Sequence, residues 1–316
     1  MVTPTTAFTD AELLVALEPV FGTGVSIVAR RDNTYTSSSR SEILTLRAGE
    51  GPLCEFLLKH ERPGREPGPV CRHGIGYCAM VYAKLIASMP LSHLNAAGLI
   101  QIGADRSPAL IVEHLDNALR VGEAPEVSGI LSAAEWCGAF HRWAEPRHRD
   151  DTLSFLERYD AGYYLAWGDR LLSLTSATGT QEAWVDGVVA AIPRMSAALV
   201  DAPTTVIHGE MSPQNVLWRE GMVYPVDWES AAIGPGEIDL AALLFGWPIE
   251  LVERSVSAYW AAREETPGDD FATRWAAATL YTAIRWVAPP SGPDDQRFAL
   301  ALVRLEETAR ALGMIP

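Results

Sequence analysis

Residues 206–241 read VIHGEMSPQNVLWREGMVYPVDWESAAIGPGEIDLA, and the rest of the chain is organised around them. The β-branched pair at 206 and 207 predicts the end of a strand. Residues 208–213 are polar and rich in turn formers, which predicts a loop. Two short strands, Asn215–Arg219 and Met222–Trp228, are expected to follow, because a Glu-Gly pair of hairpin length separates them.

Three oxygen-bearing side chains converge in this pattern. A tight hairpin brings its two ends together, so Asn215 at the start of the first strand and Asp227 at the end of the second can point at one spot. Glu210 lies on the loop just before them. One amide and two carboxylates form a hard-oxygen site that suits Mg²⁺ and phosphate chemistry. The alternative is a polar loop and hairpin in an ordinary α+β domain, which requires no particular spacing.

The pattern His-Gly-Glu-x-x-x-x-Asn, a hairpin, Asp-x-Glu and then Gly-x-x-x-x-Asp-Leu-Ala resembles the catalytic segment of the aminoglycoside phosphotransferase/choline kinase superfamily. These are small-molecule kinases with a protein-kinase-like fold. The resemblance implies an α+β bilobal fold, with a small antiparallel-sheet N-terminal lobe carrying one helix and a larger, mainly helical C-terminal lobe. The family pattern has Asp at the position of Glu210.

The resemblance also implies a role for each polar residue of the segment. Glu210 would orient or deprotonate the acceptor hydroxyl. Asn215 and Asp227 would hold Mg²⁺ against the phosphates of ATP. His208 would brace the loop by packing and hydrogen bonding, and Asp239 would tie the loop down through its backbone N–H groups.

The N-terminal third predicts a capped helix followed by strands. Thr9 and Glu12 have the spacing of a capping box. Strands are expected at Val25–Arg30, Ser41–Arg47 and Leu53–His60.

Lys59 lies on the third of these strands and is one of only two lysines in the chain; the other basic residues are arginines. The resemblance implies that Lys59 contacts the α- and β-phosphates of ATP as a compact point charge. The alternative is a lysine that extends into water from an edge strand.

Two further segments are implied to bind the nucleotide. Ser37, Ser38 and Ser39 lie in the loop between the first two strands, where backbone N–H groups and hydroxyls would cover the phosphates. Glu113 and Leu115 lie at the end of a strand expected at 109–113, where the backbone would hydrogen-bond adenine. The alternatives are a solvated hairpin loop and an ordinary strand end.

A helix is predicted over Gly74–Met89, because apolar residues recur at helical spacing. In a kinase-like fold this helix supplies a glutamate that pairs with the strand lysine. No acidic residue occurs from Pro67 to Ala104, and Cys78 or Met80 falls at the expected position. The candidates for a substitute are Glu55, Glu61, Glu66 or a rearranged segment.

The chain is expected to form two domains, a nucleotide-covering lobe at 1–112 and a catalytic and acceptor-binding lobe at 113–316. After the hinge the pattern becomes mainly helical. Ser132 and Glu135 predict a helix start. Helical periodicity recurs at 152–175, 182–200, 249–263, 271–287 and 294–312. His141 is expected to be a satisfied core histidine.

Composition sets further bounds. The 316 residues are 48% hydrophobic and 21% charged, as in a soluble globular protein, and four cysteines without paired spacing indicate reduced thiols in a cytoplasm. The pattern predicts no membrane segment. The formal charge of −15 disfavours nucleic acid as a partner and is compatible with a cationic substrate. The sequence names neither the acceptor nor an oligomeric state.

The sequence therefore predicts an enzyme that uses ATP and Mg²⁺ to phosphorylate a hydroxyl of a small molecule, aminoglycoside-like or another amino alcohol or natural product. A serine or threonine of a peptide is a variant acceptor. The alternative is a weak or inactive pseudokinase that acts as a binding or scaffold protein. It is motivated by the missing helix acid and by Glu210, because one methylene moves a carboxylate by roughly 1.5 Å and a misplacement of ~1 Å can cost about 10²-fold in rate.

Overall fold

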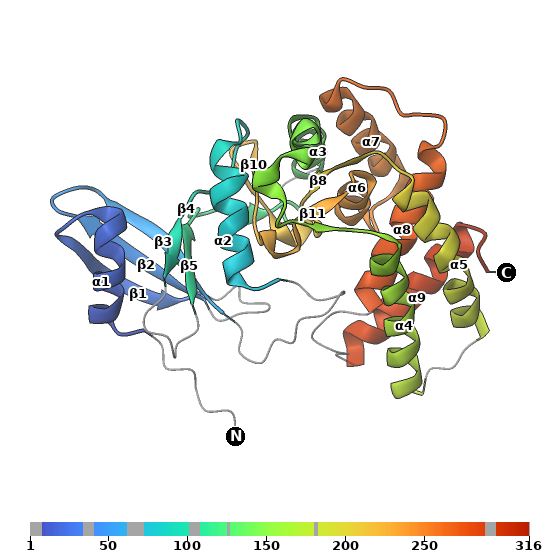
Figure 1. Cartoon of the computed structure of the whole chain (residues 1–316), viewed down its shortest axis with the longest axis horizontal. Helices are drawn as coiled ribbons and strands as arrows, with labels where there is room; N and C mark the ends of the chain where they lie inside the picture. Colours follow the sequence, from blue (N-terminus) through green and yellow to red (C-terminus); the bar gives the residue numbers. More distant parts are fainter. Residues whose placement is uncertain are drawn as a thin grey trace. The chain divides into compact units, whose positions relative to one another are not determined.

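The computed structural model describes residues 8–33, 41–61, 73–100, 108–124, 127–179, 183–287 and 295–315. The chain divides into two compact units (Figure 1). The first contains the described parts of Met1–Pro67 with His73–Ala118 and Val226–Glu229. The second contains the described parts of Leu119–Pro225 and Ser230–Pro316. The main break thus follows Ala118, and a short segment after the hairpin returns to the first unit.

The first unit is built on a five-stranded antiparallel sheet in the order β1-β2-β3-β5-β4. Its strands are β1 (Val25–Asp32), β2 (Ser41–Ala48), β3 (Leu53–His60), β4 (Ala96–Ile100) and β5 (Ala109–Glu113). β1, β2, β3 and β5 were expected from runs of apolar and β-branched residues, and β3 and β5 have the predicted bounds. Side chains alternate between the two faces of each strand, so the neighbours Lys59 and His60 face opposite sides.

One face of this sheet is covered by α1 (Asp10–Phe21). The predicted capping box is present: the Glu12 amide donates to Thr9 Oγ1 at 3.3 Å, and the Thr9 amide donates to Glu12 Oε2 at 2.8 Å. The helix and sheet share one hydrophobic core, which includes Leu13, Leu17, Leu44, Leu46, Leu58 and Ile111. Burial of these side chains fixes which face of the sheet α1 covers.

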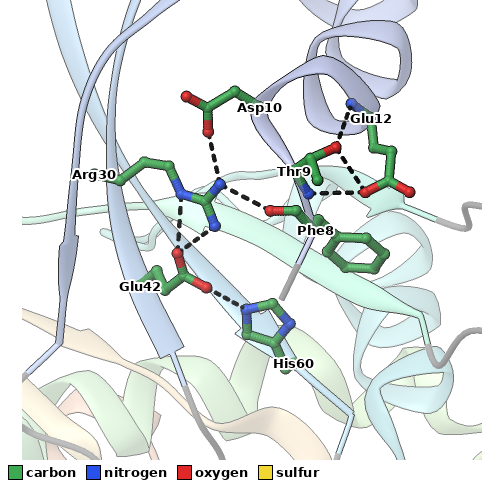
Figure 2. A network of polar contacts seen from close by, with 7 residues as sticks. All are labelled: Phe8, Thr9, Asp10, Glu12, Arg30, Glu42 and His60. Carbon is green, nitrogen blue, oxygen red and sulfur yellow. Dashed lines mark hydrogen bonds and ion pairs between the residues drawn. The ribbon is translucent and has the colours of Figure 1, made fainter. Parts of the chain in front are cut away.

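A polar network ties the start of α1 to the same face of the sheet (Figure 2). Arg30 on β1 donates to the Phe8 carbonyl at 2.8 Å and pairs with Asp10 at 2.7 Å. Its other nitrogens bind Glu42 on β2, whose second oxygen lies 3.0 Å from Nε2 of His60. Burial alone would raise the pKa of Glu42, but the hydrogen bonds from Arg30 and His60 outweigh it and lower that pKa.

The face of the sheet that carries Lys59 packs on α2 (Ile75–Lys84), which is followed by a 3₁₀ turn, η1 (Ile86–Ser88). The predicted helix over 74–89 is thus one helix and one short turn. Its buried side chains include Cys78 and Tyr82. The segment 226–229 belongs to this unit, and the Glu229 carbonyl accepts from the His73 amide at 3.0 Å.

The second unit is mainly helical. Its helices are α3 (Ser128–Ala144), α4 (Ala161–Ala177), α5 (Ala183–Val200), α6 (Glu237–Leu244), α7 (Ile249–Arg263), α8 (Phe271–Val287) and α9 (Asp295–Ala311). Short 3₁₀ turns are η2 (Glu145–Arg149), η3 (Asp151–Leu153), η4 (Pro213–Asn215) and η5 (Trp228–Ser230), the last spanning the two units. The bounds of α7 and α8 are those predicted. By length and composition alone α5 could cross a membrane. In this structure Val185, Val188, Ile192 and Leu199 of α5 belong to the main core of the unit.

Two small sheets hold the quoted segment. Their strands are β6 (Leu119–Arg120), β7 (Glu157–Arg158), β8 (Thr204–Ile207), β9 (Val216–Arg219), β10 (Met222–Pro225) and β11 (Ala232–Pro235). The hairpin β9-β10 pairs with β6, and β11 lies between β7 and β8. The turn residues Glu220 and Gly221 have φ of 53° and 83°, which a two-residue hairpin turn of type I′ requires.

Two helix predictions were wrong at their starts. Ser132 and Glu135 do not cap a helix, because α3 begins at Ser128 after Val127, which supplies no side-chain cap. The helix predicted from residue 152 begins at Ala161, where Asp160 accepts from the Tyr163 amide at 2.8 Å. A side-chain acceptor at the first turn satisfies a free backbone N–H, which sets this start.

Candidate active site

The loop after β8 has a fixed backbone. Gly209 has φ of +76°, and a Cβ at this position would overlap the carbonyl oxygen of Ser230. Only glycine fits both constraints. The close approach therefore sets the direction in which the chain carries Glu210 away from the strand.

Asp239 holds this loop from the first turn of α6. It is fully buried, and its carboxylate accepts from the His208 amide at 2.6 Å and from the Gly209 amide at 2.8 Å. The predicted role of Asp239 is confirmed. His208 is also fully buried, and its Nδ1 accepts from the Glu210 amide at 3.3 Å. His208 therefore braces the loop, as expected.

A buried network continues behind Asp239. His141 on α3 lies with Nε2 3.1 Å from Asp239 Oδ2 and Nδ1 2.8 Å from the Tyr259 hydroxyl. Both ring nitrogens thus have partners, and the predicted core histidine is confirmed. Cys137 Sγ lies 3.9 Å from the same ring, so Cys137, His141 and Asp239 have the spacing of a metal site. Burial raises the pKa of the Cys137 thiol, which disfavours the thiolate that a metal needs.

Glu210 and Asn215 lie together in the second unit. The Asn215 side-chain amide donates to the Glu210 carbonyl at 2.9 Å, which leaves the Asn215 side-chain oxygen as its remaining acceptor. Ser230 and Arg285 both lie near the Glu210 carboxylate. Ser230 Oγ donates to Glu210 Oε2 at 3.3 Å, and Arg285 Nη2 lies 3.8 Å from the same oxygen.

In the first unit, Lys59 pairs with two carboxylates of the segment 226–229. Its Nζ contacts Asp227 Oδ1 and lies 3.4 Å from Glu229 Oε1. Burial alone would lower the pKa of Lys59, but Asp227 and Glu229 outweigh it and raise that pKa. The amine therefore stays protonated. The structure thus brings together two predicted site residues, Lys59 and Asp227.

This pairing answers the question of the missing helix acid. Glu55 binds Arg31 at 2.7 Å, and Glu61 accepts from the Ile75 amide at 2.7 Å at the start of α2, so neither pairs with Lys59. Glu66 lies outside the described residues. The carboxylates that lie at Lys59 are those of Asp227 and Glu229, neither of which was among the named candidates.

Cys78 lies beside the lysine on α2. Its thiol interacts electrostatically with Lys59, and it is fully buried. Burial raises the pKa of Cys78 to about 12, so the thiol is neutral. Of the two positions expected for the missing acid, Cys78 thus places a neutral group beside Lys59, and Met80 is exposed.

The backbone of Asp227 has φ of 66°, in the left-handed region that few residues other than glycine adopt. Aspartate tolerates this region better than most residues. Such backbone conformations cost about 1–3 kcal/mol and cluster at functional sites.

The other predicted nucleotide contacts are the serines at 37–39, Glu113 and Leu115. Ser37, Ser38 and Ser39 lie outside the described residues. Glu113 ends β5, and its carboxylate accepts from the Asn95 amide at 2.8 Å. Leu115 is half-buried and follows the strand without regular secondary structure. The contacts of Glu113 and Leu115 with adenine stay predictions.

Three residues of the site were missed by sequence reasoning. Glu229 was quoted in the Asp-x-Glu pattern without a role. Ser230 follows it and has no distinguishing signal. Arg285 lies in a helix that was predicted correctly, but nothing in its local pattern shows that it reaches the loop at 209. Its position one helical turn after Tyr281 becomes informative only when the fold is known.

Comparisons with known proteins agree on the fold. A family model described as "Phosphotransferase enzyme family" (APH) matches residues 49–278. Among curated proteins, no sequence matches the chain. The GDP and kanamycin complex of APH(2″)-IIIa has a TM-score of 0.64 at 12% identity, over 95% of this chain and 98% of that one. Choline kinase from Cryptosporidium parvum has a TM-score of 0.61 at 13% identity, over 91% of each chain. Macrolide 2′-phosphotransferase MphH from Brachybacterium faecium has a TM-score of 0.56 at 16% identity, over 94% and 98%.

Proposed function

The chain belongs to the phosphotransferase enzyme family, and we propose that it transfers the γ-phosphate of ATP, with Mg²⁺, to a hydroxyl of a small molecule. The observation that carries this proposal is the contact of Lys59 with Asp227 and Glu229. A buried lysine kept protonated by two carboxylates is a fixed positive charge, which suits it to bind phosphate oxygens. Asp227 is 27% exposed as a side chain and offers a carboxylate, a ligand type that Mg²⁺ takes in proteins.

Asn215 and Asp227 are the residues that we propose hold Mg²⁺. Their donor set fits a hard cation, because Asp227 offers a carboxylate and Asn215 has its amide oxygen left once its NH₂ is bound to Glu210. The hairpin register pairs Val216 with Pro225, so the two ligands flank its open end in the sequence. Bound Mg²⁺ would neutralise charge on the phosphates.

Glu210 is the residue that we propose accepts the proton of the acceptor hydroxyl. As the hydroxyl oxygen forms its bond to the γ-phosphorus, the bond from phosphorus to the bridging oxygen breaks and ADP leaves. The loop that carries Glu210 is held by Asp239 through two amides, so the carboxylate starts from a fixed backbone. Phosphoryl transfer depends chiefly on such positioning and on electrostatics.

The acceptor that we propose is an amino-sugar or other amino-alcohol compound. Two observations support it. The similar APH(2″)-IIIa structure contains kanamycin together with GDP. The chain carries a formal charge of −15, and an acidic protein raises the local concentration of a cationic substrate.

The test is a thermal shift with Mg·ATP, with Mg·GTP and with ATP plus a chelator, on wild type, Asp227→Asn and the control Asp269→Asn. Asp269 is exposed and lies far from the site in the sequence. At a ligand concentration of 100 times Kd, binding adds about 2.7 kcal/mol to stability. We expect a Mg²⁺-dependent shift in wild type and in Asp269→Asn that is lost in Asp227→Asn.

The second step is phosphate transfer from the nucleotide that gives a shift to a panel of amino sugars and amino alcohols, followed by mass spectrometry. A shift with Mg·GTP but not with Mg·ATP would mean that GTP is the phosphate donor, with the same transfer chemistry. No shift with either nucleotide at millimolar concentration would contradict the proposal and favour a binding protein without transfer activity.

A further inference from the structure

One face of the small sheet β10-β9-β6 carries two arginines. The strand register pairs Leu217 with Arg120 on one side and with Tyr224 on the other, so these three side chains share a face. Arg219 lies two residues after Leu217 on β9 and points to the same face. Met222 pairs with Arg219 and is 46% exposed. We call these five residues the arginine face, and all of them belong to the second unit.

The opposite face of this sheet is apolar and buried. Val216 is 0% exposed and Val223, on the neighbouring strand, is 2% exposed. The sheet therefore packs on the second unit through that face. The arginine face is half-buried at Leu217 and Tyr224, so it is turned away from the core.

Both arginines of this face have a buried donor without an acceptor. In the part of the chain that the structure describes, Arg120 Nη1 and Arg219 Nε are buried and have no hydrogen-bond partner. A buried donor that lacks an acceptor is unfavourable, because it has given up its bonds to water. The acids nearest in the sequence, Glu123 and Glu220, form no ion pair with either arginine among these described residues.

This arrangement is unusual for the chain. The formal charge is −15, so acidic partners are abundant, and the arginines Arg263 and Arg274 pair with Glu145 and Glu237. Arg120 and Arg219 are diagonal neighbours on adjacent strands, a relation that puts residues about 7–8 Å apart and within reach of long side chains. Two like charges at that distance repel, and an anion between them would remove both the repulsion and the unsatisfied donors.

The donors favour phosphate over carboxylate. A carboxylate is matched by the planar fork of one guanidinium group. A phosphate monoester carries a charge of about −1.5 to −2 at pH 7 and three acceptor oxygens, which suits two guanidinium groups from two strands. Leu217 lies between Arg120 and Tyr224 in the register, so an apolar and aromatic surface adjoins the two cations.

We propose that the arginine face binds a phosphate group, with Arg120 Nη1 and Arg219 Nε donating to its oxygens and with Leu217 and Tyr224 packing against the organic part of a phosphate ester. This site goes beyond the proposed transfer reaction and does not depend on it. Lys59 belongs to the first unit, whereas the whole arginine face belongs to the second.

The test is titration calorimetry with inorganic phosphate, phenyl phosphate and benzoate. It compares wild type with Arg120→Gln, Arg219→Gln, the double variant and Arg120→Lys. Arg194→Gln is the matched control, because Arg194 is an exposed arginine on α5. Lys59→Met removes the other cation that we propose binds phosphate oxygens, so it shows which site the probe occupies.

We expect each Arg→Gln variant to raise Kd for phenyl phosphate about 10- to 100-fold, because each loses a charged hydrogen bond, and the double variant to lose binding. Arg120→Lys keeps the charge without the fork and should recover part of the affinity. Arg194→Gln and Lys59→Met should stay within about twofold of wild type, because neither residue belongs to the arginine face.

The three probes distinguish the ligands. Tighter binding of phenyl phosphate than of inorganic phosphate supports a site for phosphate esters, and equal binding supports a site for free phosphate. Tighter binding of benzoate overturns the assignment to phosphate. The proposal is also overturned by a wild type that binds no probe at roughly 10 mM, by equal Kd in wild type and the double variant, or by loss of binding in Lys59→Met.

A second measurement locates the ligand without relying on affinity. In the ¹⁵N spectrum, the Nε–H resonance of Arg219 is identified by its loss in Arg219→Lys. It should move when phenyl phosphate is added to wild type or to Lys59→Met, and an unmoved resonance overturns the proposal. This result also decides if Arg120→Gln fails to fold. A wild type that binds phenyl phosphate here but shows no shift with Mg·ATP or Mg·GTP would contradict the proposed function alone.

Discussion

Lys59 and Asp227 lie 168 residues apart in the sequence and form an ion pair in the first unit. The segment that contains Asp227 follows a hairpin of the second unit and returns to the sheet that carries Lys59. The contact links the strand lysine to the Asp-x-Glu pattern. It also supplies the lysine with the carboxylates that α2 lacks.

The first prediction is that Lys59→Met lowers stability and abolishes the Mg·ATP shift. Removing the amine takes the charged contact of Lys59 from Asp227 and Glu229, and losing such a partner at a largely buried site costs about 1–3 kcal/mol. The control is Lys84→Met, the other lysine of the chain, which is exposed at the end of α2. Urea unfolding measures the first effect and thermal shift the second. If the two variants behaved alike in both measurements, the contact of Lys59 would contribute neither to stability nor to nucleotide binding.

The second prediction concerns Asp239→Asn. Asp239 accepts from two loop amides and lies beside His141, and an asparagine oxygen carries no charge while its NH₂ faces donors. We expect a loss of about 1–3 kcal/mol in unfolding free energy and a fall in kcat. The exposed Asp186→Asn on α5 is the control and should change neither. Full activity in Asp239→Asn would contradict a role in holding the loop.

Much of this site could be predicted from the sequence because its signals are local. The loop at 208–213, the hairpin turn and the position of Asp239 follow from turn chemistry and spacing. The helices at 249–263 and 271–287 follow from apolar periodicity. Lys59 stood out because the chain has only two lysines.

The rest could not be predicted because it depends on distant partners. β7 and β11 are two and four residues long and exist only through pairing, as Ala232 pairs with both Glu157 and Ile207. The start of α3 has no side-chain cap, so the Ser-x-x-Glu pattern inside the helix was mistaken for one. The contact of Arg285 with the loop at 209 spans 76 residues. No local pattern encodes such contacts.

The third prediction is a pH dependence of stability that comes from Glu42. The pKa of this carboxyl is lowered in the folded protein from its ordinary value of 4.5, chiefly by the hydrogen bond from Arg30 against the opposing effect of burial. A group whose pKa is depressed by folding stabilises the protein above its unfolded pKa, and that contribution is lost as the pH falls through the folded pKa. The stability of wild type relative to Glu42→Gln should therefore be constant near neutrality and shrink below a pH of about 4.5.

Urea unfolding between about pH 3 and pH 7 measures this difference. Glu50→Gln, an exposed residue between β2 and β3, is the control and should show a much smaller change. A constant difference across the whole range would contradict a role for the ionised carboxylate in the network of Figure 2.

The fourth prediction concerns Cys78→Glu, which places an acid at one of the two helix positions where the resemblance leads one to expect it. Lys59 is already paired with Asp227 and Glu229. A third carboxylate, at the fully buried position 78, would therefore have no unpaired lysine to bind. It would also add volume to a packed site, which typically costs about 1–3 kcal/mol.

We therefore expect Cys78→Glu to lower the unfolding free energy and to leave phosphate transfer the same or lower, while Cys78→Ser, which is close in size and neutral, retains transfer activity. Urea unfolding and phosphate release from Mg·ATP measure the two effects. A stable Cys78→Glu variant with faster transfer would show instead that Lys59 lacks a partner in the working enzyme. The pairing with 227 and 229 would then belong to a resting arrangement of the lysine rather than to a replacement for the missing acid.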